Sequence, residues 1–326
     1  MGEAIMIRKI TRDKPLKILG FTDTHLSTGR ESDLWTLRLI RETAAAEKAD
    51  LILFVGDNVA GPAQSVRAFT EFMTEIGLPW CPVLGNHEGE HPKDTSRAET
   101  AAIFKESPCC MIPPEMPKTA DGVSLFGHTN YVVPLCNDSG EVCHKLIFLD
   151  GGNEMSDADK VRLGYTHPPR FPYDFLKESQ IEWYREEVRK DDCPSMVFCH
   201  IALPEFRELA EAGNFLFGEK RESVCSSLHN SGMFKAMCEE GRTVAFVAGH
   251  DHVNDFHILH EGIRLMYNRA SGLSAYNMIS QKVSEHSGVG CTVYTVDYEG
   301  NVTFRDLLFE DYFPEYRDDI HRVIRK

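Results

Sequence analysis

Short apolar runs alternate with amphipathic stretches through the first half of the chain, and this alternation restricts the fold more than any other feature of the sequence. Strand candidates lie at 17–21, 51–55 and 80–84, and helix candidates lie at 32–50 and 65–77. We expect Ser32 to cap the first helix and Gly77 to end the second. Leu34, Leu37 and Ile40 are expected near one face of the first helix. Strands that alternate with helices in this way predict an α/β protein.

The second half of the chain continues the pattern and adds hairpins. Further strand candidates lie at 195–199 and 243–248, helix candidates at 177–188 and 232–240, and hairpin candidates at 129–150, 255–268 and 291–304. The polar stretch 151–178 reads as a long loop, and such loops in compact proteins are usually functional or flexible. Because no linker or repeat divides the sequence, residues 1–326 are expected to form a single domain.

Charge and cysteine content exclude several classes of protein. The formal net charge is -15, from 35 lysines and arginines against 50 acidic residues, so the surface repels phosphate backbones and no nucleic-acid partner is expected. The sequence has no run of about 18 apolar residues for a membrane span and no apolar signal-peptide core at its N-terminus. We therefore expect a cytoplasmic protein with no membrane partner, whose cysteines are reduced and structural.

Metal-competent side chains follow five of the strand candidates, each time directly after the apolar run. They are Asp23 and His25 in "TDTH", Asp57 in "GDN", Asn86 and His87 in "GNHE", His200 in "CH", and His250 and His252 in "GHDH". Ligands of α/β sheets gather at the carboxyl ends of the strands. The sequence therefore predicts that these side chains meet at one edge of the protein.

The chemistry of this donor set suits two divalent metal ions. Imidazole and carboxylate bind manganese, iron, cobalt or zinc, and the absence of cysteine from the set disfavours a closed structural zinc site. The donors outnumber the needs of one ion, and a bridging carboxylate would hold two ions about 3.5–4 Å apart, as in enzymes that activate water against phosphorus. Each motif alone is also compatible with an ordinary polar turn or a structural histidine, but their common placement after strands favours a metal site.

The ordered motifs D-x-H, G-D, G-N-H-E, a lone H and G-H-x-H resemble those of the calcineurin-like metallophosphoesterase superfamily. The stretches "NSGMFKAM" and "VAGHDHVNDF" look more narrowly like the branch related to purple acid phosphatase 29. The resemblance implies a four-layer α/β/β/α sandwich, in which two mixed sheets are flanked by helices.

The resemblance also implies a role for each donor. Asp23, His25 and His252 would hold the first ion, Asp57 would bridge, and Asn86, His200 and His250 would hold the second. A metal-bound hydroxide would attack phosphorus, and His87 would protonate the leaving group, since imidazoles as a class titrate near neutral pH.

Two departures from related enzymes narrow the subfamily. Purple acid phosphatases place an iron-binding tyrosine three residues after the aspartate of the second motif, where this chain has Ala60, so the protein is expected to be colourless. Serine/threonine protein phosphatases of the superfamily carry a second acid and an arginine in this motif. Ala60 and Gly61 stand there instead, which argues against a protein phosphatase.

The expected function is hydrolysis of a small phosphomonoester. A phosphodiesterase acting on cyclic nucleotides or lipid head groups is the alternative within enzymes, and a noncatalytic metal-binding scaffold is the alternative outside them. Substrate selectivity is expected in segments 153–174 and 215–230, and the oligomeric state is left open.

Overall fold

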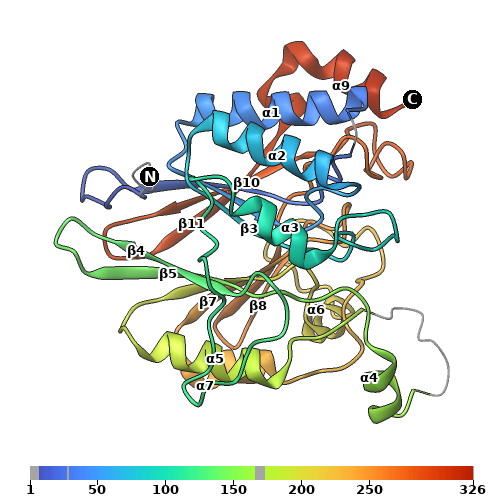
Figure 1. Ribbon diagram of the computed structural model, residues 1–326. Coiled ribbons are helices and arrows are strands. Elements are labelled where there is room, and N and C mark those ends of the chain that lie inside the picture. The colour runs from blue at the N-terminus through green and yellow to red at the C-terminus, as the bar shows by residue number, and fades with distance from the viewer. Residues whose placement is uncertain (1–6, 28, 166–172, 326) are drawn as a thin grey trace.

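The computed structural model describes residues 7–27, 29–165 and 173–325 (Figure 1). Within these ranges the strands form two sheets, and the first has the order β11-β10-β1-β2-β3. Its strands are β1 (Leu16–Phe21), β2 (Leu51–Val55), β3 (Trp80–Val83), β10 (Gly290–Val296) and β11 (Val302–Leu308). The first three run parallel, β10 is antiparallel to β1, and β11 is antiparallel to β10. The three predicted strands and the C-terminal hairpin are confirmed.

The second sheet has the order β4-β5-β6-β7-β9-β8. Its strands are β4 (Tyr131–Cys136), β5 (Val142–Phe148), β6 (Ser195–Phe198), β7 (Thr243–Ala248), β8 (His257–His260) and β9 (Ile263–Tyr267). Parallel strands β5, β6, β7 and β9 are bordered by antiparallel β4 and β8. The predicted turn between β8 and β9 is confirmed: Glu261 and Gly262 have φ of 48° and 80°, the left-handed pair that a tight hairpin needs.

Helices cover the outer faces of both sheets (Figure 1). Those described are α1 (Glu31–Glu47), α2 (Ala63–Ile76), α3 (Arg97–Phe104), α4 (Asp157–Arg162), α5 (Glu178–Arg189), α6 (Pro204–Ala210), α7 (Met233–Glu240), α8 (Phe309–Tyr312), the 3₁₀ turn η1 (Pro314–Tyr316) and α9 (Arg317–Ile324). In Figure 1, α1, α2 and α9 lie above the first sheet, and α5 and α7 lie below the second. Gly77, with φ of 72°, ends α2 as predicted.

The start and the face of α1 differ from the prediction. The helix begins at Glu31, because the Asp33 carboxylate accepts a hydrogen bond of 3.0 Å from the Arg30 backbone N–H and fixes the first turn ahead of Ser32. Ser32 is therefore not the cap. Of the three side chains expected near one face, Ile40 is buried, Leu37 is half-buried and Leu34 is 60% exposed, so Leu34 lies at the solvent edge of the helix.

Several helices were not predicted from the sequence, and α4 lies inside the segment predicted to be a loop. These helices are short, so they give little periodic signal. A local signal existed for α3: Ser96 Oγ accepts a hydrogen bond from the Glu99 N–H at 3.2 Å, which is an N-cap three residues before an acidic side chain. Part of the 151–178 segment, residues 166–172, lies outside the described residues.

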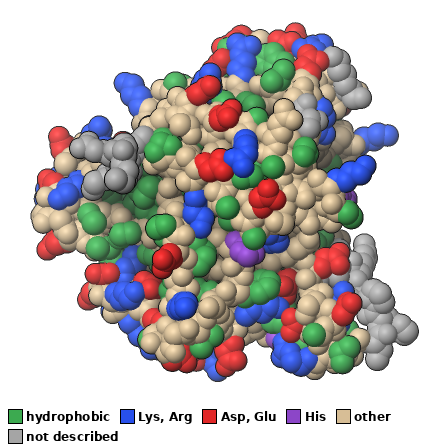
Figure 2. Space-filling view, in the orientation of Figure 1, with side chains coloured by type: hydrophobic (Ala, Val, Ile, Leu, Met, Phe, Trp, Pro, Cys, Tyr) green, Lys and Arg blue, Asp and Glu red, His purple; other side chains and the backbone are tan. Residues whose placement is uncertain are grey.

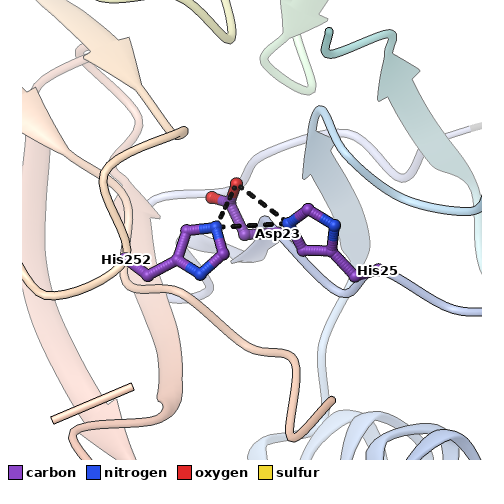
Figure 3. A group of neighbouring side chains, drawn as sticks. All are labelled: Asp23, His25 and His252. Carbon is purple, nitrogen blue, oxygen red and sulfur yellow. Dashed lines mark hydrogen bonds and ion pairs between the residues drawn. The ribbon is translucent and has the colours of Figure 1, made fainter. Parts of the chain in front are cut away.

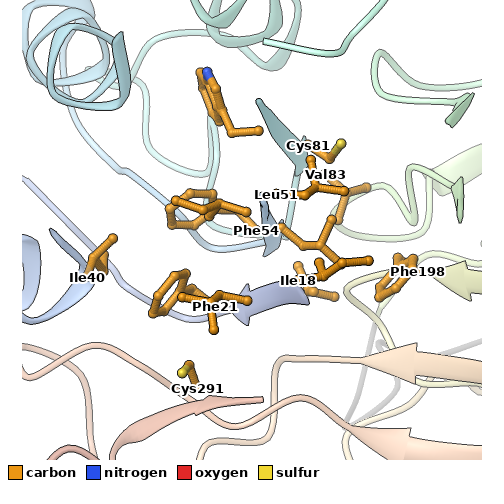
Figure 4. Packing of buried hydrophobic residues seen from close by; sticks show 14 of the residues in the cluster. Ile18, Phe21, Ile40, Leu51, Phe54, Cys81, Val83, Phe198 and Cys291 are labelled. Atoms are coloured by element: carbon orange, nitrogen blue, oxygen red, sulfur yellow. The ribbon is translucent and has the colours of Figure 1, made fainter. Parts of the chain in front are cut away.

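The larger hydrophobic cluster fills the space between the two sheets and continues on the other side of the first sheet, under α1 and α2 (Figure 4). Strand β6 shows why: Met196 and Phe198 point into this core, while Val197 between them packs on the helix side with Trp183 of α5. Alternate side chains of a strand face opposite sides, so a continuously apolar strand is buried on both. Ile18 of β1 and Phe198 of β6 enter the same cluster from the two sheets. The four-layer α/β/β/α sandwich is confirmed.

Other expectations about the whole chain have mixed outcomes. No disulfide joins cysteines within the described residues, and their reduced state stays a prediction. Among the described residues, no helix is both long enough and apolar enough to cross a membrane. The single domain spanning residues 1–326 stays a prediction.

Candidate metal centre

The predicted site residues lie in five connections that follow β1, β2, β3, β6 and β7. Hydrogen bonds tie these turns together, because the Asp23 N–H donates to Gly56 O at 3.0 Å and the Gly249 N–H donates to His200 O at 3.1 Å. The bond from Asp23 to Gly56 joins the connections after β1 and β2 of the first sheet. The bond from Gly249 to His200 joins the connections after β7 and β6 of the second sheet. The carboxyl ends of parallel strands thus bring distant sequence positions to one edge of the sandwich.

Asp23, His25 and His252 form the first donor group (Figure 3). The Asp23 Oδ1 atom lies 3.3 Å from His252 Nε2 and 3.8 Å from His25 Nε2, and the two imidazole nitrogens are 3.2 Å apart. The three side chains converge on one point from the turns after β1 and β7. The geometry brings together the donors assigned to the first ion.

Asp57, His200 and His250 form the second donor group, and Asn86 adjoins it. His200 Nε2 lies 3.1 Å from Asp57 Oδ2 and 3.2 Å from Asn86 Oδ1. The ring centroids of His200 and His250 are 5.2 Å apart. The donors assigned to the second ion are therefore also neighbours.

Asp57 lies between the two groups. Its Oδ2 atom is 3.7 Å from His25 Nε2 of the first group and 3.1 Å from His200 Nε2 of the second. A carboxylate in this position can serve both groups at once, which is the arrangement expected of a bridging ligand.

Two buried polar atoms in these groups have no hydrogen-bond partner among the described residues: Asp23 Oδ1 and His250 Nε2. Buried polar atoms are rarely left unsatisfied, and an unsatisfied one calls for an explanation such as an ion. Both atoms are ordinary ligand atoms for a divalent cation. The donor set therefore fits two such cations, one in each group. The assignment of individual ligands stays a prediction.

Backbone carbonyls set the orientation of two of the imidazoles. His200 Nδ1–H donates to Val55 O at 2.8 Å, and His252 Nδ1–H donates to Tyr276 O at 3.0 Å. Each bond places a proton on Nδ1 and directs Nε2 toward the donor group. This is the second contact that metal-binding histidines usually make.

Burial and charge shift the pKa values in the centre. Burial lowers the pKa of His25 to about 4 and that of His250 to about 3, so both imidazoles are neutral near pH 7 and can act as ligands. Burial alone would lower the pKa of His200, but the Asp57 carboxylate raises it to about 9. Burial alone would raise the pKa of Asp57, but the neighbouring histidines, led by His200, hold it well below its usual range.

The backbone is strained at several of these positions. Asp23, His25, Asp57 and His250 have φ of 53°, 43°, 49° and 77°, in the left-handed region that side chains other than glycine disfavour. Each such residue costs on the order of 1–3 kcal/mol and persists only where the surrounding structure imposes it. Strain of this kind clusters at functional sites, and here it coincides with predicted ligands.

Glu88 of the "GNHE" motif holds the turn rather than facing the donors. Its carboxylate accepts hydrogen bonds from the Asn58 N–H at 2.6 Å and the Gly85 N–H at 2.7 Å. Burial, with a smaller contribution from Asp57, raises the pKa of Glu88. Its two backbone contacts join the turn after β2 to the turn after β3, which carry Asp57 and Asn86.

His87, the predicted acid, stands at the half-buried edge of the centre. Its Nε2 atom is 3.9 Å from Asp57 Oδ2, and its Nδ1 atom contacts the Glu90 carboxylate. Sequence reasoning missed Glu90. The sequence did offer a signal for this contact, because Glu90 stands three positions after His87 and side chains at that spacing can meet across one turn.

The donors open onto a cleft of about 440 Å³. Its lining includes His25, Asp57, His87, His250 and His252 from the predicted set, together with Ser27, Arg30, Ala60, Tyr173, Cys225, Ser274, Ala275 and Tyr276. Tyr173 and Cys225 come from the two segments expected to control selectivity. Ser274 and Tyr276 were missed, because their segment has neither periodicity nor a motif.

The protein is expected to show no tyrosinate-to-iron absorption band after loading with ferric iron. Ala60 lines the cleft and stands at the sequence position where the resemblance implies the ligand tyrosine of a purple acid phosphatase. Burial raises the pKa of Tyr173 and of Tyr276, which opposes ionisation of both phenols. The visible absorption spectrum of the iron-loaded protein provides the measurement, and a broad charge-transfer band would contradict the expectation.

Comparison with known proteins agrees with this geometry. The profile of the calcineurin-like phosphoesterase family matches residues 16–254. Probable inactive purple acid phosphatase 14 of Arabidopsis thaliana is 30% identical over 309 residues, covering 83% of this chain and 74% of that protein. Probable inactive purple acid phosphatase 29 of the same plant is 29% identical over 296 residues, covering 80% and 72%. The predicted branch is thereby confirmed.

A solved structure shares the fold. A dimetal phosphatase from Danio rerio superposes with a TM-score of 0.60 at 13% sequence identity, covering 89% of this chain and 95% of that one. The matched residues 16–254 include every strand end that carries a predicted donor. The chain belongs to the calcineurin-like phosphoesterase family and is a metal-dependent phosphoesterase.

Proposed function

We propose that the protein hydrolyses a small phosphomonoester at a two-cation centre. The observation that carries the proposal is the position of Asp57, whose Oδ2 faces nitrogen donors of both groups at 3.7 and 3.1 Å. Asp23, His25 and His252 would hold one cation, Asn86, His200 and His250 the other, with Asp57 shared. When bound, divalent cations of the manganese, iron, cobalt or zinc type activate water and neutralise charge on the phosphoryl oxygens.

The side chains of the chain itself orient the centre and move a proton. The Val55 and Tyr276 carbonyls keep the Nε2 atoms of His200 and His252 directed at the donors. His87 has its Nδ1 on the Glu90 carboxylate and its Nε2 on the cleft side, 3.9 Å from Asp57. From that position Nε2 can deliver a proton to the departing alcohol oxygen, which is general-acid catalysis.

The size and charge of the surroundings support a small substrate. The cleft of about 440 Å³ suits a small molecule rather than a protein segment. On the described part of the face in Figure 2, basic side chains are interspersed with acidic ones instead of forming a tract. We therefore propose a small phosphorylated partner, and neither nucleic acid nor membrane.

The noncatalytic scaffold is the competing function, and the names of the two Arabidopsis relatives call those proteins probably inactive. The complete donor set argues for catalysis in this chain. A scaffold has no need for Asp23 Oδ1 and His250 Nε2 to be buried without hydrogen-bond partners, since such burial costs free energy.

The state of the cysteines supports a location. No disulfide joins cysteines within the described residues, and reducing compartments keep thiols in this state. We propose that the protein acts in the cytoplasm.

Removal and return of metal test the function. The purified protein is expected to hydrolyse para-nitrophenyl phosphate, to lose this activity on dialysis against a chelator, and to regain it with manganese or zinc. The reason is that the histidine and carboxylate donors do not activate water without bound cations. Bis(para-nitrophenyl) phosphate should be cleaved more slowly. Faster cleavage of the diester would identify a phosphodiesterase, and absence of both turnover and bound metal would revive the scaffold.

A further inference from the structure

The cleft is larger than the phosphoryl group that the metal centre would hold. A volume of about 440 Å³ exceeds that of a phosphoryl group, which is comparable to a few water molecules of about 30 Å³ each. A second cavity of about 520 Å³ adjoins it and shares Arg30, Ser274, Ala275 and Tyr276 as lining. Space for the alcohol part of the ester therefore lies directly beside the donors, and Tyr276 forms a wall of both cavities.

Tyr276 is a fixed aromatic surface at this place. Its ring stacks on the His252 imidazole with centroids 4.0 Å apart and planes inclined by 7°. Its hydroxyl donates to Glu222 Oε2 at 2.9 Å, and Glu222 Oε1 in turn accepts from the Val253 N–H at 2.9 Å. The ring is nevertheless 36% exposed. A ring held at one face and at its hydroxyl can receive a ligand without losing much side-chain freedom.

Tyr173 brings a second ring to the same cleft, beside the other donor group. Its ring meets the His250 imidazole edge-on, with centroids 4.4 Å apart and planes inclined by 82°. It is half-buried, and it belongs to the segment expected to control selectivity. One tyrosine thus lies against a histidine of each donor group.

We propose that Tyr276 and Tyr173 form a subsite for a planar aromatic group, so that the natural substrate is a phosphomonoester with an aromatic ring in its alcohol part. The inference rests on the proposed function and names the substrate class of the same site. Three small side chains, Ala60, Ala275 and Cys225, line the same cleft as the two rings. Flat π systems stack on fixed aromatic side chains in offset or edge-on arrangements, which non-planar groups of equal size cannot do.

Affinities of phosphonates test the subsite without turnover, because a phosphonate lacks the ester bond. Calorimetric titration of the manganese-loaded protein should show phenylphosphonate binding about tenfold more tightly than cyclohexylphosphonate, the size expected of two aromatic contacts. Tyr276→Leu and Tyr173→Leu should each reduce the ratio of phenylphosphonate to cyclohexylphosphonate affinity about threefold, whatever they do to the affinity for methylphosphonate. Tyr276→Phe should keep the preference. Tyr312→Leu is the matched control, since Tyr312 is 37% exposed and lies outside both cavities.

The outcomes separate the subsite from the metal centre. Equal affinities for the phenyl and cyclohexyl compounds, with methylphosphonate bound, would overturn the subsite and leave the proposed function standing. If no phosphonate binds, the proposed two-cation centre is wrong. Binding of β-naphthol then tests the aromatic subsite separately, because an uncharged ring does not need cations to bind. Fluorescence titration should then show binding that Tyr276→Leu weakens, and binding that is absent or insensitive to this change would overturn the inference.

Discussion

The Asp57→Asn variant is expected to lose more than about 100-fold in the rate of para-nitrophenyl phosphate hydrolysis, because a shared ligand should matter more than the outer partners of a metal site. Asparagine keeps the shape of aspartate and can still accept the hydrogen bond of 2.8 Å that the His87 N–H gives to Oδ1. It replaces the other oxygen, which faces His25 and His200, by an amide NH₂ that cannot be a ligand. The loss therefore reports the bridging position and not the fold.

Metal content and an exposed control complete this experiment. The variant should bind fewer manganese ions per chain than the wild-type protein, measured by elemental analysis after dialysis, with an unchanged circular dichroism spectrum. Asp138→Asn makes the same chemical change on the exposed β4–β5 turn and should have no effect. Full activity of Asp57→Asn would remove Asp57 from the mechanism.

The Gly85→Ala variant is expected to lose about 10–100-fold in activity although it removes no ligand. Gly85 packs against the predicted ligand Asp57, and changing a residue that positions a metal ligand typically has an effect of this size. A Cβ atom at position 85 would lie 2.2 Å from Asp57 Oδ1 and 2.3 Å from the Asp57 backbone nitrogen. Contacts this short force a movement. The Asp57 backbone already has a left-handed φ of 49°, and the His25 N–H donates to its carbonyl at 2.9 Å, so its position relative to the first group should change.

A control variant at a second glycine distinguishes displacement of Asp57 from the loss of stability that any glycine-to-alanine change at a left-handed position can cause. Gly122→Ala meets no atom within 4 Å, and at φ of 88° it should cost roughly 1–2 kcal/mol of stability while leaving activity intact. Steady-state kinetics and thermal unfolding of both variants provide the comparison. If Gly85→Ala keeps wild-type activity, the contact with Asp57 does not matter for the chemistry.

The donor positions could be predicted from the sequence because they depend on local rules. Strand β2 is five buried apolar residues followed by Gly56 and Asp57, and such a strand in an α/β chain delivers the next residues to the carboxyl edge. The need for glycine at position 56 is visible only in the structure, because a Cβ atom there would lie 2.3 Å from His200 Nδ1. The packing of one connection against another cannot be read from either alone.

The parts that the sequence did not predict depend on contacts between distant segments. Tyr276 reaches the centre only because the loop after β9 folds over His252, and that loop has no periodic pattern. The start of α1 was misplaced because a single side chain, Asp33, outweighs the usual preference for serine as a cap. Short helices such as α6 and α9 are stabilised by packing, which leaves little trace in local sequence.

Anomalous diffraction from crystals grown with manganese tests the central claim most directly. Two peaks are expected on opposite sides of the Asp57 carboxylate, one in contact with Asp23, His25 and His252, and the other with Asn86, His200 and His250. A single peak, or peaks that lie beyond bonding distance of Asp57, would contradict the shared two-cation centre.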